Sequence, residues 1–183
     1  MSDFRGLDTK QRGVALGMAG ALATGLAVLW VAHRHTPESW VGGEPVAARL
    51  AIAAWSIVLA ALALFVCIAR LAKHRFFTPA DIDGSGLSDG TSHAKLLQAL
   101  LQNTLEQMAL ATAVYLAAAV LFPLAWLGAV PAAAALFLLG RALFCARYEH
   151  GASARAVGFA LTFYPTVILL VALVVLGLGR LVA

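Results

Sequence analysis

Five polar or charged side chains lie within otherwise apolar segments. Arg141, Tyr148 and Arg155 follow one another at intervals of seven residues, which places the first two on one helix face. Asn103 and Glu106 share a face of another apolar segment. Such groups are costly at membrane depth unless they are paired or line a wet cavity, so they are candidates for a functional site. Together they suit a small zwitterionic ligand that offers carboxylates to arginine and an amine to glutamate.

The composition identifies the chain as an integral membrane protein. Of its 183 residues, 62% are hydrophobic and 12% are charged, whereas soluble domains contain roughly 25% charged residues. Because about 20 apolar residues cross the hydrocarbon core, five spans fit in this length. No ten-residue alternation typical of a barrel occurs, so every span should be a helix. The predicted fold is an all-α membrane bundle.

The spans are separated by polar segments and by prolines. Ser92 is the predicted N-cap of the third span, and Pro123 joins the third and fourth spans in an antiparallel hairpin. Gly13 and Gly17 permit close helix packing, either within the protomer or between subunits. We expect spans at residues 14–32, 46–71, 94–122, 124–148 and 152–182. They divide into two units. Residues 1–45 contain the N-terminal tail, the first helix and an outer loop, and residues 46–183 form a four-helix bundle with a cytoplasmic loop at 72–93.

The basic residues predict the orientation of the spans. Lysine and arginine concentrate in cytoplasmic loops, and ten of the 13 fall on one side of the predicted topology. This bias predicts a cytoplasmic N-terminus and a C-terminus outside. The first residues, MSDFRGLDTKQRG, carry charges of both signs and no hydrophobic segment that ends at a small-residue cleavage site, so no cleaved signal peptide is expected. Trp30, Trp40 and Trp126 would then form part of an outer aromatic belt. The ten are Arg5, Lys10, Arg12, Arg70, Lys73, Arg75, Lys95, Arg141, Arg147 and Arg155, and the other three are Arg34, Arg49 and Arg180.

This topology places the five polar residues at a shared depth in the inner leaflet. Arg141 is the nearest candidate partner for Glu106, and a helix break near Gly151 would direct Arg155 back toward the same polar pocket. The alternative is a structural Glu106–Arg141 ion pair, with Arg147 and Arg155 as interfacial anchors.

Other chemistry is not indicated. Cys67 and Cys145 lie in apolar spans and are interpreted as small core residues. The segment DIDGSG at 81–86 resembles the start of a calcium-binding loop, but Ser92 occupies the twelfth position, where such a loop needs glutamate. The histidines are not spaced as metal ligands, so no metal site is expected. Basic residues are few and follow the topology, so no nucleic-acid partner is expected.

Two stretches resemble the membrane-associated proteins in eicosanoid and glutathione metabolism, the MAPEG family. They are LQALLQNTLEQ at 97–107, with its N-x-x-E, and GRALFCARYEHGASARAVGF at 140–159, with its R-x6-Y-x6-R. The alanine-rich composition and the loop FFTPADIDGSG are similar to those of bacterial members. The resemblance implies a four-helix MAPEG-like bundle, here preceded by one extra transmembrane helix, that assembles as a homotrimer in the bacterial inner membrane.

The resemblance also implies roles for the five polar residues. Asn103, Glu106, Arg141 and Tyr148 correspond to positions that bind glutathione as a co-substrate, and Arg155 to the arginine that stabilises its thiolate. The chain is therefore interpreted as a glutathione-dependent transferase or peroxidase that acts on a lipophilic electrophile entering from the membrane lipid.

Two substitutions favour an alternative on the same trimeric fold. Ala99 and Phe144 stand where catalytic members of the family usually have arginine and tyrosine. The alternative is a non-catalytic lipid-binding or scaffold protein. A small transporter with a midplane site is a third possibility, although the spans show no internal repeat.

Overall fold

The computed structural model describes residues 8–37, 39, 45–84 and 86–182. Arg5 and Trp40, which entered the orientation argument, lie outside these residues. Three short 3-10 turns precede the last three long helices: η3 (Pro79–Asp81), η4 (Leu124–Trp126) and η5 (Tyr148–His150). The long helices of the described part are α1 (Thr9–Arg34), α2 (Pro45–Phe77), α3 (Ser92–Leu121), α4 (Ala129–Arg147) and α5 (Ala152–Val182).

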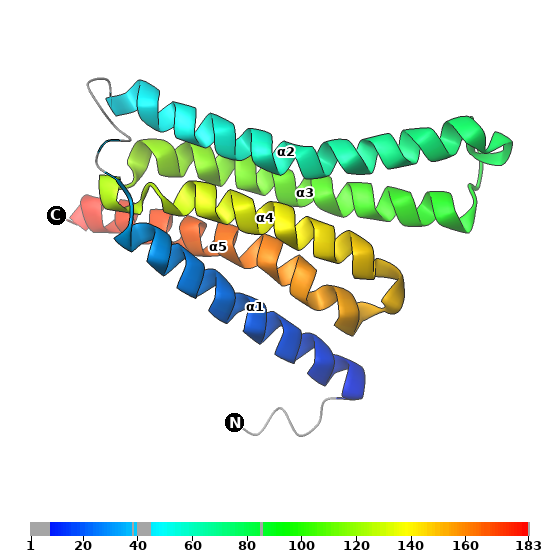
Figure 1. Ribbon diagram of the computed structural model, residues 1–183, viewed down its shortest axis with the longest axis horizontal. Helices are drawn as coiled ribbons and strands as arrows, with labels where there is room; N and C mark the ends of the chain where they lie inside the picture. Colours follow the sequence, from blue (N-terminus) through cyan, green and yellow to red (C-terminus); the bar gives the residue numbers. More distant parts are fainter. Residues whose placement is uncertain (1–7, 38, 40–44, 85, 183) are drawn as a thin grey trace.

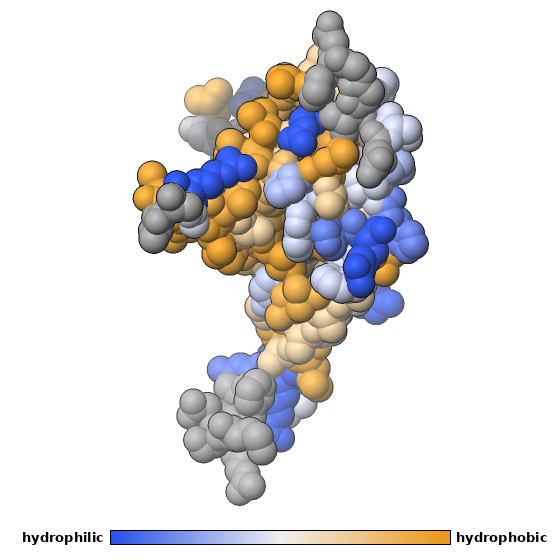
Figure 2. Space-filling model, turned by 90° about the vertical axis from the view of Figure 1, so that its left-hand side faces the viewer, coloured by the Kyte–Doolittle hydropathy of each residue, from blue (hydrophilic) through white to orange (hydrophobic). Residues whose placement is uncertain are grey.

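The chain is a multi-pass membrane protein. In the described part, five helical segments are long and apolar enough to cross a membrane. They alternate in direction, so that the α2–α3 and α4–α5 connections lie at the end opposite to the α3–α4 connection and the C-terminus (Figure 1). Hydrophobic side chains cover much of the end-on view in Figure 2, with the hydrophilic ones in separate patches. The prediction of an all-α membrane bundle with an additional first helix is confirmed.

Helices α4 and α5 touch through two glycines. A Cβ atom on Gly158 would lie 2.4 Å from the backbone nitrogen of Phe144, and one on Gly140 would lie 2.6 Å from Oγ1 of Thr162. Small residues at helix interfaces in membranes allow such backbone contact, which maximises dispersion attraction where water supplies no driving force. The two glycines therefore bring the α4 and α5 segments that carry Arg141 and Arg155 together.

Helix α1 packs along α5 of the same chain. A Cβ atom on Gly13 would lie 2.8 Å from Oγ of Ser153, and one on Gly17 would lie 3.2 Å from Cγ2 of Val157. The Ser153 hydroxyl also donates a hydrogen bond of 3.0 Å to the carbonyl oxygen of Lys10. The predicted close packing of the two glycines thus occurs within the protomer.

The helix ends differ from the predicted spans at three places. Helix α2 continues to Phe77, so the connection to α3 is shorter than the predicted loop at 72–93. The N-cap of α3 is Thr91 rather than Ser92, because the Thr91 hydroxyl accepts a hydrogen bond of 3.2 Å from the Ala94 amide. Helix α4 starts at Ala129 rather than 124, because η4 occupies the residues after Pro123.

Tryptophans gather at the end where α3 meets α4, as the aromatic-belt prediction requires. The ring of His33 stacks on Trp126 with centroids 4.2 Å apart, and the ring of Trp30 lies 5.8 Å from His33. Trp30 and Trp126 thus lie at the same end of the bundle, and their place in an outer aromatic belt stays a prediction.

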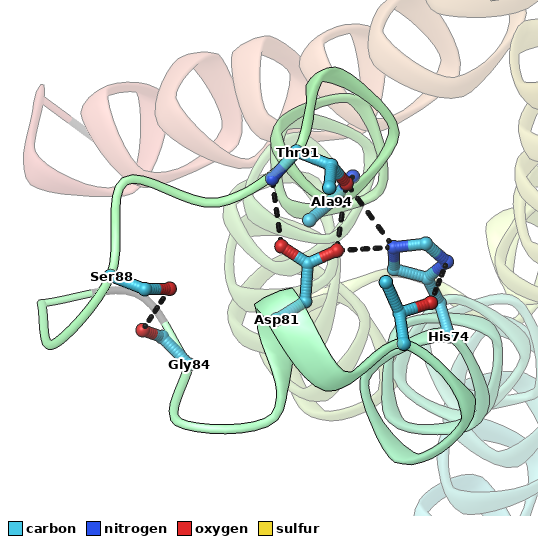
Figure 3. A network of polar contacts seen from close by, with 7 residues as sticks. His74, Asp81, Gly84, Ser88, Thr91 and Ala94 are labelled. Carbon is cyan, nitrogen blue, oxygen red and sulfur yellow. Dashed lines mark hydrogen bonds and ion pairs between the residues drawn. The ribbon is translucent and has the colours of Figure 1, made fainter.

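A buried carboxylate organises the connection between α2 and α3 (Figure 3). Asp81, 1% exposed, lies with Oδ2 2.7 Å from Nε2 of His74, at the end of α2. Thr91 donates from its amide to Oδ1 and from its hydroxyl to Oδ2, both at 2.7 Å. These contacts join α2, η3 and the start of α3.

The contacts of Asp81 predict that the stability of the connection between α2 and α3 depends on pH. Hydrogen bonds from the side chain and backbone of Thr91, with a contribution from His74, hold the pKa of the Asp81 carboxyl below its ordinary value of 3.8. The folded connection therefore binds this proton less tightly than the unfolded chain does. The resulting stabilisation is fully present above pH 3.8 and is lost as the pH falls through the folded-state pKa.

At neutral pH, Asp81→Asn should increase amide hydrogen exchange across residues 78–91 by about tenfold or more, because charge-assisted hydrogen bonds to the carboxylate are lost. The matched control is Asp83→Asn, since Asp83 is exposed. Mass spectrometry of the exchanged peptides measures the effect. Equal exchange in the two variants would contradict the role given to Asp81.

Candidate functional site

Arg141 lies in the core of the bundle and links three helices. Its side chain is 1% exposed. Nε donates to Oγ1 of Thr162 on α5 at 3.0 Å, and Nη1 donates to Oδ1 of Asn103 on α3 at 2.7 Å. Nη2 is buried without a hydrogen-bond partner in the described part of the chain. Because an arginine can only donate, it fixes the amide oxygen of Asn103 toward itself and directs the amide nitrogen away.

Two aromatic rings connect the side chain of Arg141 to that of Arg155. The guanidinium carbon of Arg141 lies 4.4 Å from the centre of the Phe144 ring, which meets the Tyr148 ring edge-on at 5.2 Å. The guanidinium carbon of Arg155 lies 4.4 Å from the centre of the Tyr148 ring. Each cation faces the electron-rich side of an aromatic ring, an arrangement that is favourable away from water.

The chain reverses at Gly151, as the sequence predicted. Its φ of 96° lies in the left-handed region, which glycine adopts without the penalty of a Cβ atom. Helix α5 begins at the next residue and carries Arg155 back over Tyr148. The seven-residue spacing therefore bridges a turn between two helices, with Arg141 on α4, Tyr148 in η5 directly after α4 ends, and Arg155 on α5.

A cavity of about 380 Å³ adjoins the rings of Phe144 and Tyr148, and we refer to it as the site cavity. Small-ligand sites span roughly 300–1,000 Å³, so its volume is near the lower end. Arg155 is the only charged residue among those described as lining it. The lining residues are Val14, Met18, Asn103, Phe144, Tyr148, Ala152, Arg155, Ala156 and Phe159.

The predicted pairing of Glu106 with Arg141 is wrong within the single chain. Glu106 is exposed on α3, and its Oε1 accepts a hydrogen bond of 3.0 Å from Nε2 of Gln102. The donors of Arg141 point instead to Asn103 and Thr162, between the helices. The structural ion pair of the alternative interpretation is also not formed, since the described residues show no contact between these two side chains.

The structure brings Asn103, Tyr148 and Arg155 to one cavity and leaves two predicted residues outside it. Arg141 lies behind Asn103, and Glu106 lies on the outer face of α3. Sequence reasoning missed Thr162, the second hydrogen-bond partner of Arg141, because a single threonine in an apolar span carries no pattern. It also missed Val14 and Met18, which look like ordinary lipid-facing residues of the first span.

Ala99 borders a different cavity, at the connection between α2 and α3. This cavity also measures about 380 Å³ and is lined by Gln98 and Gln102 among others. Arg75 at its edge donates a hydrogen bond of 3.1 Å from Nη2 to Oε1 of Gln98. A polar face of α3 thus runs from Gln98 through Gln102 to Glu106, outside the site cavity.

The two cysteines line the same small cavity, which their sequence positions did not indicate. Both border a third cavity, of about 150 Å³, together with Arg141. The Cys67 sulfur lies 3.5 Å from Oγ1 of Thr104. Cys67 is buried, as expected of a core residue, whereas Cys145 is half-buried and packs against the core.

The comparison with known protein families agrees with this architecture. The family described as the MAPEG family matches residues 50–175, which extend from α2 into α5 and include all five predicted site residues. Helix α1 lies outside the matched part. No curated protein and no solved structure matches the chain. With its membrane bundle and with the match covering most of its length, the chain belongs to the MAPEG family of glutathione and eicosanoid metabolism.

Proposed function

We propose that this protein is a glutathione-dependent transferase or peroxidase that acts on a lipophilic electrophile. The observation that carries the proposal is the position of Arg155, a single cation above the ring of Tyr148 at a cavity that also receives Asn103. A cation beside a thiol favours the thiolate, which is the nucleophilic form. The rest of the cavity lining is mainly apolar, which suits a lipophilic second substrate.

Each polar residue receives a role from its contacts. Arg155 stabilises the glutathione thiolate, and Tyr148, whose ring holds the Arg155 guanidinium, orients the tripeptide with its hydroxyl group. Asn103 donates to the ligand from its amide nitrogen, because Arg141 occupies its amide oxygen. Arg141 was predicted to bind glutathione directly, and its burial behind Asn103 supports a positioning role instead.

Glu106 is assigned to the glutathione site of a neighbouring subunit. An exposed carboxylate on a membrane-spanning helix is costly in lipid, and Glu106 is exposed on α3. In a homotrimer, Glu106 of a neighbouring subunit would bind the amine of the tripeptide held at Arg155. The distribution of lysine and arginine supports an N-terminus and a glutathione site that face the cytoplasm. The resemblance of the alanine-rich composition and of the loop FFTPADIDGSG to bacterial members supports the bacterial inner membrane as the location.

Glutathione binding is the direct test of the proposal. At 100 times its dissociation constant, glutathione should stabilise the purified protein by about 2.7 kcal/mol, measured as a rise in Tm. Asn103→Ala should reduce this shift, because the amide contact is lost. Arg147→Ala is the control and should retain the shift, since Arg147 is exposed at the end of α4 and does not line the site cavity.

The alternative function is non-catalytic lipid binding on the same trimeric fold. It is favoured by the apolar part of the site cavity, where Phe144 stands in place of a tyrosine. In that case millimolar glutathione would leave Tm unchanged, whereas a fatty acid would raise it. This pair of results would overturn the enzymatic proposal.

A further inference from the structure

Helix α1 forms one wall of the site cavity. Val14 and Met18 are four residues apart, so they share a face of α1, and both line the cavity. Phe144 and Phe159 line it as well, at ring centroids 6.3 Å apart. The cavity therefore combines a polar part at Asn103, Tyr148 and Arg155 with apolar side chains from α1, α4 and α5.

The position of this wall is fixed by close packing. Each lining residue of α1 directly follows a glycine that contacts α5, namely Gly13 before Val14 and Gly17 before Met18. The hydrogen bond from Ser153 to the Lys10 carbonyl oxygen holds the start of the helix. Without Cβ atoms at the two glycines, the α1 backbone lies close to α5, and this brings Val14 and Met18 to the cavity.

The cavity volume limits what fits beside the wall. Within about 380 Å³, the reacting part of a thiol ligand lies beside the part of the apolar substrate that faces α1. A polar ligand at Arg155 leaves the substrate the space bordered by Val14, Met18 and Phe159. Removing methylene groups from that border enlarges the space, whereas a larger side chain reduces it.

We propose that Val14 and Met18 are specificity-determining residues that select electrophiles with slender apolar substituents over bulky ones. The inference rests on the proposed glutathione-dependent function and assigns a role to a helix outside the family match. It concerns the shape of the second substrate, which Asn103, Tyr148 and Arg155 do not determine.

A pair of esters that differ only in their alcohol part tests the proposal. Methyl and cyclohexyl 4-chloro-3-nitrobenzoate share one electrophilic ring carbon, where the glutathione sulfur forms a bond. Chloride leaves with the electron pair of the carbon–chlorine bond, and the thiol proton passes to solvent. The measured quantity is kcat/KM for the cyclohexyl ester divided by kcat/KM for the methyl ester.

Met18→Ala should raise this ratio about tenfold, the scale at which pocket size discriminates substrates. Val14→Phe should lower it by a similar factor. Leu16→Ala is the matched control on the same helix, because Leu16 is 75% exposed and does not line the cavity. Its ratio should equal that of the wild type. A ratio that is unchanged in Met18→Ala and Val14→Phe, or changed equally in Leu16→Ala, would overturn the proposal.

Binding of an unreactive analogue separates this inference from the proposed function. Cyclohexyl 4-methyl-3-nitrobenzoate has no leaving group, so its effect on Tm reports occupancy without turnover. If no variant conjugates glutathione but Met18→Ala binds this analogue more tightly than Leu16→Ala does, the enzymatic proposal fails and the wall retains its selective role. If conjugation proceeds and the analogue binds all variants equally, the role given to Val14 and Met18 is refuted and the proposed glutathione-dependent function stands.

Discussion

Arg155→Ala should lower kcat/KM for glutathione conjugation by about 100- to 1,000-fold, the usual cost of removing one electrostatic contact to developing or stabilised negative charge. Arg155 is the only charged residue described as lining the site cavity, so none of the other lining residues replaces its charge. Its guanidinium is held over Tyr148 at 4.4 Å, which fixes the cation before the substrate arrives. The variant should still fold, because Arg155 contributes to the cavity wall and not to the α4–α5 glycine contact.

The pH dependence distinguishes this role from a merely structural one. Without the neighbouring positive charge the bound thiol ionises less readily, so the acid limb of the pH–rate profile should move to higher pH in Arg155→Ala. Arg155→Lys keeps a charge and should restore part of both the rate and the profile. Arg147→Ala serves as the control for general loss of positive charge at this end of the bundle. Wild-type rates and an unshifted profile in Arg155→Ala would refute the assignment of the thiolate to this residue.

Gly158→Ala should destabilise the bundle by about 3 kcal/mol or more, at the upper end of overpacking effects. The added Cβ atom would lie 2.4 Å from the nitrogen and 2.7 Å from Cα of Phe144, and 2.8 Å from the carbonyl oxygen of Gly140. These are backbone atoms, so no side-chain rotation relieves the contact and α4 must move away from α5. The hydrogen bond between Arg141 and Thr162 crosses the same interface and should lengthen or break.

Gly177→Ala provides the matched control on the same helix. Apart from the backbone of its own helix turn, no atom of the described residues lies within 4 Å of a Cβ built at Gly177, so this change should stabilise α5 by about 0.5–1 kcal/mol through the higher helix propensity of alanine. Equilibrium unfolding in detergent, titrated with a denaturing detergent, measures both variants. Equal stability of Gly158→Ala and the wild type would show that α4 and α5 tolerate a wider separation.

The number and type of the helices followed from the sequence alone, because these properties depend on local physics. A segment of about 20 apolar residues must satisfy its own backbone hydrogen bonds in lipid, and only a helix does so without partner strands. The reversal before Arg155 was also predictable, since Gly151 interrupts an otherwise helical segment and in the structure adopts a φ of 96°.

The pairing of the polar side chains required the tertiary structure. Sequence spacing predicted a similar depth in the membrane for Glu106 and Arg141 but not the direction in which each residue points around its helix axis. That rotation is set by packing between helices, and for α4 the contact of Gly140 with Gly158 fixes the face that meets α5. As a result Arg141 meets Asn103 and Thr162, whereas Glu106 lies on the outer face.

The sequence by itself determined a five-span helical membrane protein and singled out a small set of polar residues within its apolar segments. Only the tertiary structure decided which of them share a cavity, and that the first helix supplies Val14 and Met18 to its wall. The physical reason is that hydrophobicity and helix formation are local, whereas a cavity is formed by side chains distant in sequence. Their approach depends on the close contacts between helices that glycines allow.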